Sequence, residues 1–579
     1  MIRAKNHGSL PFCGWRRTNV DFPESANPRI RIGRRTGRAT WAADVWLDLA
    51  PGQQAQVDPA ASDEAPPLRE IPKDLAEHFG GPLKICGEPM HLLSTRQDAA
   101  GHLIHFRGRR GRLFCIDFVG IWHPELPGVV DGKLLVTASN PAVPDMQEAL
   151  PALEIQWGDA RVVTPYGDLK PAMPFFDGQA RAIPVTFVWE RHLATEADAN
   201  TAIGVAQRVI SAIGVRDLPL GVPKMPTGFQ PAAWWWRHLH IAGNLSTWAH
   251  PELGPAANTA QGGGQEDQIF VGGEPWHPNG IGTELLTECA ALATSGHPCH
   301  HLEIDGSVVD VERHPNLRMF HSRPHRTGSD LLGKSRLMEA GEAMGWAGPD
   351  AQHWLIARKS VAAHMTGDPV IQRLLEHDAR NYLIQLTLQP EASTSKIWSA
   401  REILWEALLV AQLFEVLEDR TLAQRVLAHS HNRLVQTIIP QVSGLGGRWI
   451  QLREDSVGPG ICWQGWQHAG GAFGLDLLGK LQSVPQAREL ALECALRCLE
   501  DVWRKEGDRW VQYGHLGISD PTYRQASDPN FNVAWNGLGI VTVLEHQPTN
   551  AKALEIWQQI KADASGEERW LPPGWAPRQ

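Results

Sequence analysis

Apolar and polar residues change their spacing along the chain near residue 230. Before this point the apolar residues form short runs that Gly, Pro and Asp interrupt, which is typical of β-strands joined by turns. The expected strands are 29–32, 43–49, 102–106, 113–119, 133–137, 153–157 and 183–190. A helix is expected after them, at 196–213. Because no helices alternate with the strands, the pattern predicts a β-sandwich rather than a parallel sheet.

After residue 232 the apolar residues recur at helical spacing. The clearest segment is 400–418, in which apolar side chains from Ile403 to Leu417 fall on one helix face. Further helices are expected at 281–294, 351–365, 369–387, 421–438, 470–481, 485–503, 533–545 and 550–562.

The tetrapeptide TGDP at 366–369 predicts a tight connection between two of these helices. Gly367 suits the left-handed end of the first helix, Asp368 can cap the second, and Pro369 suits its first turn. Such short connections make consecutive helices antiparallel neighbours. A repeat of fixed length is not visible, which favours a closed ring of helix pairs over an open solenoid.

The expected fold is therefore a multi-domain α+β protein with an N-terminal β-sandwich and a C-terminal α/α toroid. The boundaries are a β-rich region at 1–216, a Pro- and Gly-rich linker at 217–231, and the toroid at 232–579.

Composition narrows the classes of function. The chain has 579 residues and a formal net charge of −10, which does not favour nucleic acid as a partner. Neither a secretory signal nor an apolar run long enough to span a membrane is recognised, so we expect a cytoplasmic protein, or one associated with a virion or released by a route without a signal. A homo-oligomer or larger assembly stays open.

The stretch 262–354 combines Gly, Pro, His, Arg, Asp, Glu and Trp with little apolar periodicity. This composition fits loops that hold a polar cleft better than a plain core.

Short motifs resemble those of exo-rhamnogalacturonan lyase-like proteins. They are HRTGSDLLGK (325–334), DAQHW (350–354), TGDP (366–369) and, in the β-rich region, GQARAIPVTFVWE (178–190). A β-sandwich followed by an α/α toroid is the layout of many polysaccharide lyases and of some glycoside hydrolases. The resemblance implies a carbohydrate-active enzyme that cleaves a polysaccharide or oligosaccharide.

Two groups of residues fit the chemistry of a polysaccharide lyase. A cation must neutralise the uronic-acid carboxylate while a base removes the neighbouring proton. Arg326 and Lys334 fit the first role and His325 the second, although a salt-bridged loop is the alternative. His353 lies beside Trp354 in the expected first helical turn, where the helix dipole favours the neutral base.

Other residues fit a hydrolase or a sugar-binding surface. Asp350 could pair with Glu266 or Asp267 as acid and base, unless Asp350 is only a helix cap and the others lie in a solvated turn. Aromatic and amide side chains could stack on sugar rings and bond hydroxyls, or pack in a core. The residues assigned to substrate binding on this basis are Trp463, Gln464, Trp466, Gln467, His468, Tyr523, Arg524 and Asn536.

No metal or other cofactor is expected, although the sequence leaves a structural calcium ion open. The segment from His297 to Asp305 is rich in possible ligands but lacks the spacing of a known zinc motif. The rival interpretation is a non-catalytic structural or glycan-binding component, such as a virion or tail-associated protein that reuses the enzyme fold.

Overall fold

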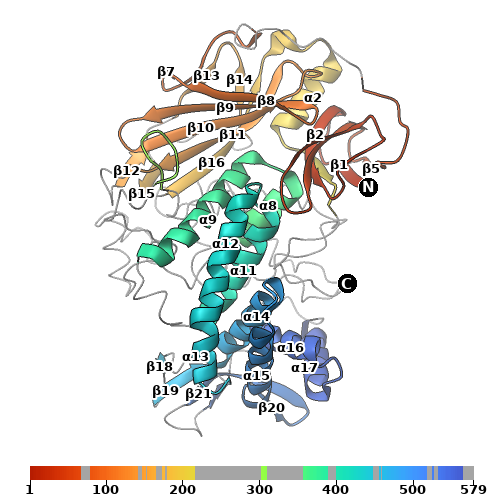
Figure 1. Cartoon of the computed structure of the whole chain (residues 1–579). Helices are drawn as coiled ribbons and strands as arrows, with labels where there is room; N and C mark the ends of the chain where they lie inside the picture. The colour runs from red at the N-terminus through yellow and green to blue at the C-terminus, as the bar shows by residue number, and fades with distance from the viewer. Residues whose placement is uncertain are drawn as a thin grey trace.

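The N-terminal part of the chain forms β-sheets and the C-terminal part forms helices, as the change of pattern near residue 230 predicts (Figure 1). The computed structural model describes residues 1–66, 78–140, 147–150, 153–164, 173–176, 179–215, 301–309, 356–388, 400–447, 455–457, 460–517, 524–526 and 533–564. The expected helix at 281–294 and the linker at 217–231 lie outside these ranges.

The largest sheet has six antiparallel strands in the order β14-β16-β11-β10-β9-β8. Their bounds are β8 His91–Asp98, β9 Gly101–Arg110, β10 Phe114–Trp122, β11 Val129–Ala138, β14 Arg161–Val163 and β16 Gln179–Val188. Both faces of this sheet are covered. In β10, Ile116 and Phe118 belong to a core within the β-rich part, whereas Val119 belongs to the core of the helices. The alternation of side chains along a strand therefore divides β10 between two cores.

A smaller sheet covers the face of the large sheet that lies away from the helices. It consists of β6 Leu83–Ile85, β7 Glu88–Pro89 and β13 Ile155–Trp157. Phe79, Leu83 and Trp157 pack there against Phe106 and Phe187 of the large sheet. The short strands β12 Gln147–Leu150 and β15 Met173–Phe176 pair with each other.

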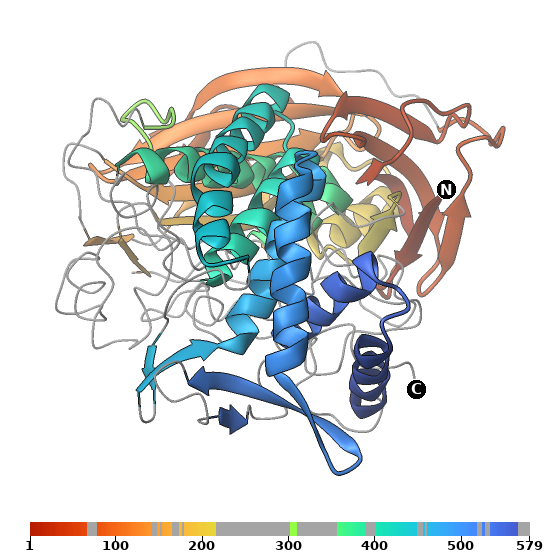
Figure 2. The same ribbon diagram turned by 60° about the horizontal axis from the view of Figure 1, so that its bottom comes forward.

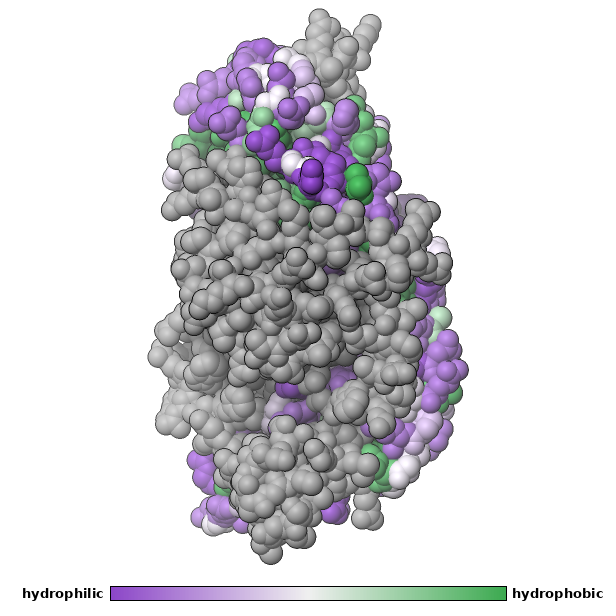
Figure 3. Space-filling view, turned by 90° about the vertical axis from the view of Figure 1, so that its left-hand side faces the viewer, coloured by the Kyte–Doolittle hydropathy of each residue, from purple (hydrophilic) through white to green (hydrophobic). Residues whose placement is uncertain are grey.

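Two three-stranded sheets at the N-terminal end pack on each other around a separate core. One contains β1 Ile2–Asn6, β5 Gln54–Val57 and β17 Ile210–Ile213, and the other contains β2 Phe12–Val20, β3 Ile30–Arg35 and β4 Trp41–Leu49. At the described β-rich end, the face drawn in Figure 3 carries mostly hydrophilic side chains with smaller hydrophobic patches.

The helix expected at 196–213 is too long and must be corrected. Helix α2 spans Glu196–Ala206 and starts with a capping box between Thr195 and Asp198. Arg208 then adopts a left-handed conformation with φ of 54°, and the chain continues as β17, which pairs with β1. Pairing with a strand from the other end of the region overrides the local helical pattern here.

Most of the expected helices are confirmed. They are α8 Ala357–Thr366, α9 Pro369–Leu388, α11 Ala400–Val416, α12 Arg420–Arg433, α14 Gly465–Leu481, α15 Pro485–Asp501, α16 Val533–His546 and α17 Ala551–Ala564. A π-helical turn at Leu434–Ile438 and helix α13 Ile439–Gly444 extend α12. Strands β18 Asp455–Val457, β19 Gly460–Gln464, β20 Trp503–Glu506, β21 Arg509–Gly517 and β22 Arg524–Ala526 lie among the later helices.

The TGDP connection folds as predicted. Gly367 has φ of 64°, and its N–H donates to the carbonyl of Ala363 over 3.1 Å. The Asp368 carboxylate accepts a hydrogen bond of 2.8 Å from the Val370 N–H at the start of α9. Pro369 is the first residue of that helix.

Helices α14 and α16, which begin two successive helix pairs, run parallel to each other. The Cβ position of Gly539 in α16 lies 3.0 Å from Ala469 Cβ in α14, and further along both helices His546 bonds Asp476 over 2.7 Å. Helices α8, α11, α14 and α16 are neighbours in this order, and α15 returns antiparallel beside α14. In Figure 2 the helices follow one another in sequence order, from green to dark blue, across the molecule. Within the described residues, none of these helices is long and apolar enough to cross a membrane.

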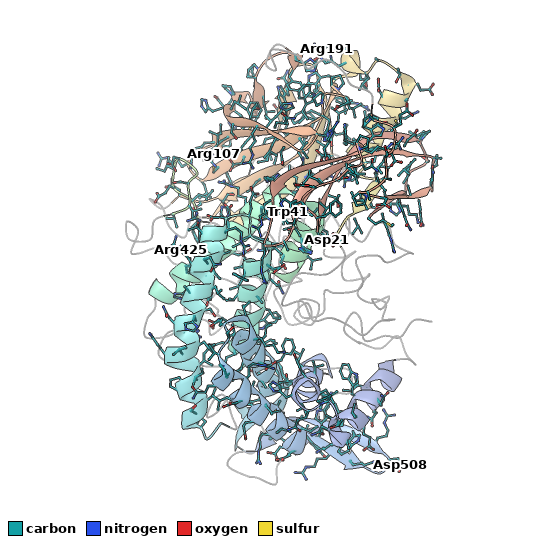
Figure 4. The ribbon with its side chains drawn as sticks, turned by 45° about the vertical axis from the view of Figure 1, so that its right-hand side comes forward. Asp21, Trp41, Arg107, Arg191, Arg425 and Asp508 are labelled. Carbon is teal, nitrogen blue, oxygen red and sulfur yellow. The ribbon has the colours of Figure 1, made fainter. Side chains whose placement is uncertain are left out.

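The β-rich part and the first helix pair are joined by direct bonds. The Asn19 amide donates to the carbonyls of Ala363 and His364 over 2.9 and 3.0 Å, and so caps the end of α8. Lys133 pairs with Asp368. Trp41 of β4 is labelled at this boundary in Figure 4.

Candidate functional site

The start of helix α14 gathers most of the predicted sugar-binding residues that the structure describes. Strand β19 ends at Gln464, and Gly465 begins the helix. A Cβ atom on Gly465 would lie 2.5 Å from Val502 Cγ2, so the close approach of α14 to the end of α15 requires glycine. This turn places Trp466, Gln467 and His468 in the first turn of α14.

Side chains in this turn contact one another and the neighbouring helix. The Gln467 amide donates to the side-chain oxygen of Gln464. The guanidinium of Arg401, at the start of α11, lies 5.8 Å from the centre of the Trp466 ring. Trp466 is 9% exposed and His468 is 1% exposed, and both glutamines are buried as well. A long polysaccharide can therefore contact these groups only if the first turn of α14 becomes accessible.

Burial also fixes the charge of His468. It lowers the pKa of this imidazole to about 3, so the ring is neutral near pH 7. A neutral imidazole can accept a hydrogen bond, but a ring with so low a pKa is a weak base, and it cannot act as a cationic neutraliser of a carboxylate.

Strand pairing brings the later candidate Arg524 to the same place. Trp463 of β19 is opposite Leu516 of β21, and Leu516 is opposite Arg524 of β22. Directly opposed residues of an antiparallel sheet share one face, so these three positions lie side by side on one face of the sheet. The parallel offset between α14 and α16 also places Asn536 level with Trp466 along the helices.

Sequence reasoning missed a buried polar network that joins α9, α11 and α12. The Tyr382 hydroxyl donates to Glu406 over 2.7 Å, and Arg433 Nε donates to the other oxygen of Glu406, also over 2.7 Å. Glu402, next to Arg401 in the first turn of α11, lies 3.8 Å from Arg433. The sequence contains a sign of this network, because two acidic residues one turn apart, Glu402 and Glu406, interrupt the apolar residues of α11.

The network does not supply a tyrosine base. Burial, followed by the charge of Glu406, raises the pKa of Tyr382 well above its usual value. The hydroxyl therefore stays protonated near neutral pH and serves as a donor to Glu406. Its role in this arrangement is to hold α9, α11 and α12 together.

The remaining predicted site residues lie outside the described part of the chain. They are His325, Arg326, Lys334, Asp350, His353, Trp354, Glu266, Asp267 and Tyr523. For Trp463, Arg524 and Asn536 only the backbone is described. Among the described residues, no group of three or more His, Cys, Asp or Glu side chains could hold a metal ion.

Comparison with known proteins adds no relative: no protein-family model matches the chain, and no curated protein is significantly similar to it.

Proposed function

We propose that this protein is a carbohydrate-active enzyme that cleaves a polysaccharide or oligosaccharide, by β-elimination or by hydrolysis. The observation that carries the proposal is the convergence at the start of α14. Gln464, Trp466 and Gln467 come together there with the backbone positions of Trp463, Arg524 and Asn536. Indole rings and side-chain amides suit the flat faces and the hydroxyl groups of sugars.

The helix pairs support a toroid as part of the same proposal. Since α14 and α16 are parallel neighbours that begin at the same level, the segments that precede these two helices in the sequence enter at the same end of the array, and α11 and α8 follow beside α14. His353 and Trp354 come shortly before α8, which starts at Ala357. A closed ring would place these segments around one cleft. A crystal structure in which the helix pairs end as an open row would contradict the toroid.

The reaction can be assigned by following two products together. The purified chain is incubated with a panel of acidic and neutral polysaccharides while unsaturated products and new reducing ends are recorded. If both appear, the reaction is β-elimination, with His325 or His353 as the base and Arg326 as the carboxylate neutraliser. If only reducing ends appear, hydrolysis is assigned and Asp350 with Glu266 or Asp267 becomes the pair to test.

Variants connect the activity to these residues. His353→Ala and His325→Ala are compared with His91→Ala, a change of an exposed histidine on β8. Loss of elimination in either of the first two variants but not in the control would support the assignment. Full activity in both would contradict it.

A non-catalytic structural or glycan-binding component is the second candidate, as in a virion or tail-associated protein. The burial of Gln464, Trp466, Gln467 and His468 favours it, because buried groups hold the protein together without touching a substrate. Binding of an oligosaccharide without formation of either product, across the whole panel, would support this function over catalysis.

A further inference from the structure

Three arginines gather where the turn between β3 and β4 meets the connection between α11 and α12. We call Arg35, Arg38 and Arg420 the arginine cluster. The Arg38 N–H donates to the carbonyl of Glu415 over 2.7 Å, so the turn is fixed against the end of α11. Trp41, the first residue of β4, is labelled at this boundary in Figure 4.

Aromatic rings support the guanidinium groups of the cluster. The Arg35 guanidinium lies 5.7 Å from the centre of the Trp41 ring. Those of Arg38 and Arg420 each lie 5.3 Å from the centre of the Phe414 ring. Contact with an aromatic face attracts a cation but adds no negative charge to balance it. The two rings therefore bring positive charges together without neutralising them.

Backbone carbonyls hold two of the guanidinium groups in place. Arg35 Nε donates to the carbonyl of Gly37 over 2.9 Å. Arg420 donates to the carbonyls of Phe414 and Leu417 over 2.6 and 3.0 Å. A carbonyl oxygen carries no formal charge, and a guanidinium has five N–H donors. These bonds therefore orient the cations and leave both their charge and further donors for a ligand.

Few carboxylates lie close to the arginine cluster. Within the part of the chain that the structure describes, only Glu415 comes within 4 Å, at 3.5 Å from Arg38. The nearby Glu418 is matched by other cations, since it lies 2.9 Å from Arg34 and 3.6 Å from Arg96. Three cations thus face one carboxylate at close range.

The electrostatics at Arg420 agree with this excess of positive charge. Burial, followed by the charge of Arg35, lowers the pKa of Arg420; the charge of Glu415 opposes this effect and that of Arg38 adds to it. The adjacent Asp419 carboxylate caps the start of α12. At Arg420 the repulsion of the other two arginines therefore outweighs the attraction of Glu415.

We propose that the arginine cluster binds the acidic groups of a polysaccharide chain. These groups are carboxylates or sulfates, which accept paired, charge-assisted hydrogen bonds from guanidinium groups. The class of partner rests on the proposed function, whereas the need for negative charge rests on the cluster alone.

The exposure of the cluster favours a chain over a single ion. The side chain of Arg38 is 54% exposed, and an exposed ion pair contributes little by itself. A chain with many acidic groups contacts several arginines at once, so the weak contacts add up. The net charge of −10 does not favour nucleic acid as the chain in question.

This surface is separate from the start of α14. Arg401, which contacts Trp466 there, lies at the other end of α11 from Phe414. The rise of an α-helix places these two ends of α11 about 20 Å apart. Binding at the arginine cluster can therefore be measured apart from cleavage.

Isothermal titration calorimetry of the full chain tests the proposal. The probes are dextran sulfate, polygalacturonate and neutral dextran, each at several concentrations of sodium chloride. Both acidic chains are expected to bind and neutral dextran is not. Their affinity should fall as salt rises, because binding to a polyanion releases counterions. Free sodium sulfate and sodium acetate are expected to bind more weakly than the chains.

Variants locate the binding. Arg35→Gln and Arg38→Gln should each weaken binding about fivefold and reduce the slope of log affinity against log salt by about one. Glu415→Gln removes the carboxylate of the cluster and should strengthen binding, an effect that a purely structural role would not produce. Arg112→Gln, at an exposed arginine of the β9–β10 turn, is the matched control and should bind like the native chain.

The proposal is overturned if the acidic chains bind no more tightly than neutral dextran, or if both arginine variants bind like the Arg112→Gln control. It is also overturned if free sulfate binds as tightly as dextran sulfate, or if an oligonucleotide or poly-glutamate binds more tightly than both acidic polysaccharides. Failure of the proposed function looks different: no polysaccharide is cleaved, although the arginine variants lose binding.

Discussion

A buried carboxylate on the large sheet shows how single residues join the two parts of the molecule. Asp117 of β10 is fully buried and accepts hydrogen bonds of 2.8 Å from His105 and from Arg107. Arg373 of α9 lies 3.5 Å from its other oxygen. Burial alone would raise the pKa of Asp117, but the His105 hydrogen bond and the charges of Arg373 and Arg107 outweigh it and lower the pKa to about 2.

Replacing this carboxylate should destabilise the protein strongly. In Asp117→Asn the cations lose their counter-charge, and the free energy of unfolding is expected to fall by about 3 kcal/mol. Urea unfolding measures the change. The matched control is Asp159→Asn, which removes an exposed pair with Arg191 and should cost less than about 1 kcal/mol. Equal losses in the two variants would contradict a special role for Asp117.

The same residue predicts part of the acid sensitivity. Because the folded pKa lies below the usual value of 3.8, the unfolded chain binds more protons between these values. The stabilisation is complete above this window and is lost as the pH falls towards about 2. Unfolding experiments over this range should show a smaller pH dependence in Asp117→Asn. An unchanged dependence would argue against the ion cluster.

The burial of His468 predicts a second range of pH over which the stability of the protein changes, and this range lies above that of Asp117. Its folded pKa of about 3 lies below the usual value of 6.5, since burial disfavours the charged ring. Stability is therefore complete above the higher value and falls as the pH drops through the window. In His468→Gln this part of the pH dependence should vanish, whereas the exposed change His91→Gln should preserve it. Chemical denaturation at a series of pH values measures both.

At the scale of elements, helix ends are set by a few residues whose partners come from elsewhere. The left-handed Gly367 ends α8, and Asn19 of β2 supplies donors for its last carbonyls. Without such donors, several carbonyls at the end of a buried helix would have no partner. The end of α8 is therefore also a joint to the β-rich part.

Glycine-to-alanine substitutions at this joint and at an open position separate the cost of backbone strain from the cost of a steric clash with Asn19. In Gly367→Ala, the left-handed φ of 64° strains the alanine backbone, and the new Cβ would also lie 2.4 Å from Asn19 Oδ1. Gly52→Ala strains the backbone only. Gly52 also has a left-handed φ, of 72°, but no atom lies within 4 Å of the position of the new Cβ. Gly52→Ala should cost about 1 kcal/mol and Gly367→Ala about 3 kcal/mol or more in thermal unfolding. A similar loss at the two positions would show that Asn19 does not restrain this turn.

At the scale of the whole molecule, the β-rich part and the helices share a core. Val119 and Leu135 of the large sheet pack in the same cluster as Ala362 and Leu374 of the first helix pair. Gln372 of α9 also donates to the carbonyls of Thr36 and Val416 over 2.9 and 2.8 Å. The β-rich part is thus a fixed support for the helices rather than a loosely tethered module.

The pair of Lys133 and Asp368 tests this coupling. A double-mutant cycle with Lys133→Gln and Asp368→Asn should give a coupling free energy of about 1–3 kcal/mol, because both groups are largely buried. Calorimetry should show one transition for both parts in the native chain. Additive effects of the two substitutions would show that the pair does not join them.

Local pattern alone determined a large share of the fold. The apolar spacing from Ile403 to Leu417 predicted α11, and the TGDP sequence predicted the α8–α9 connection, because both depend on residues adjacent in the sequence. The same reasoning found the Trp and Gln residues at the start of α14. Their resemblance to sugar-binding chemistry stays a prediction.

Tertiary structure decided what depends on distant partners. Strand β2 was not predicted, because Arg17 is polar in sequence and buried only through Asp44 and Asp98. Residues 210–213 became a strand because β1 pairs with them. The network of Tyr382, Glu406 and Arg433 and the arginine cluster likewise join residues from separate elements. Periodicity in a sequence records which face of an element is buried, but only the folded chain determines which charges meet there.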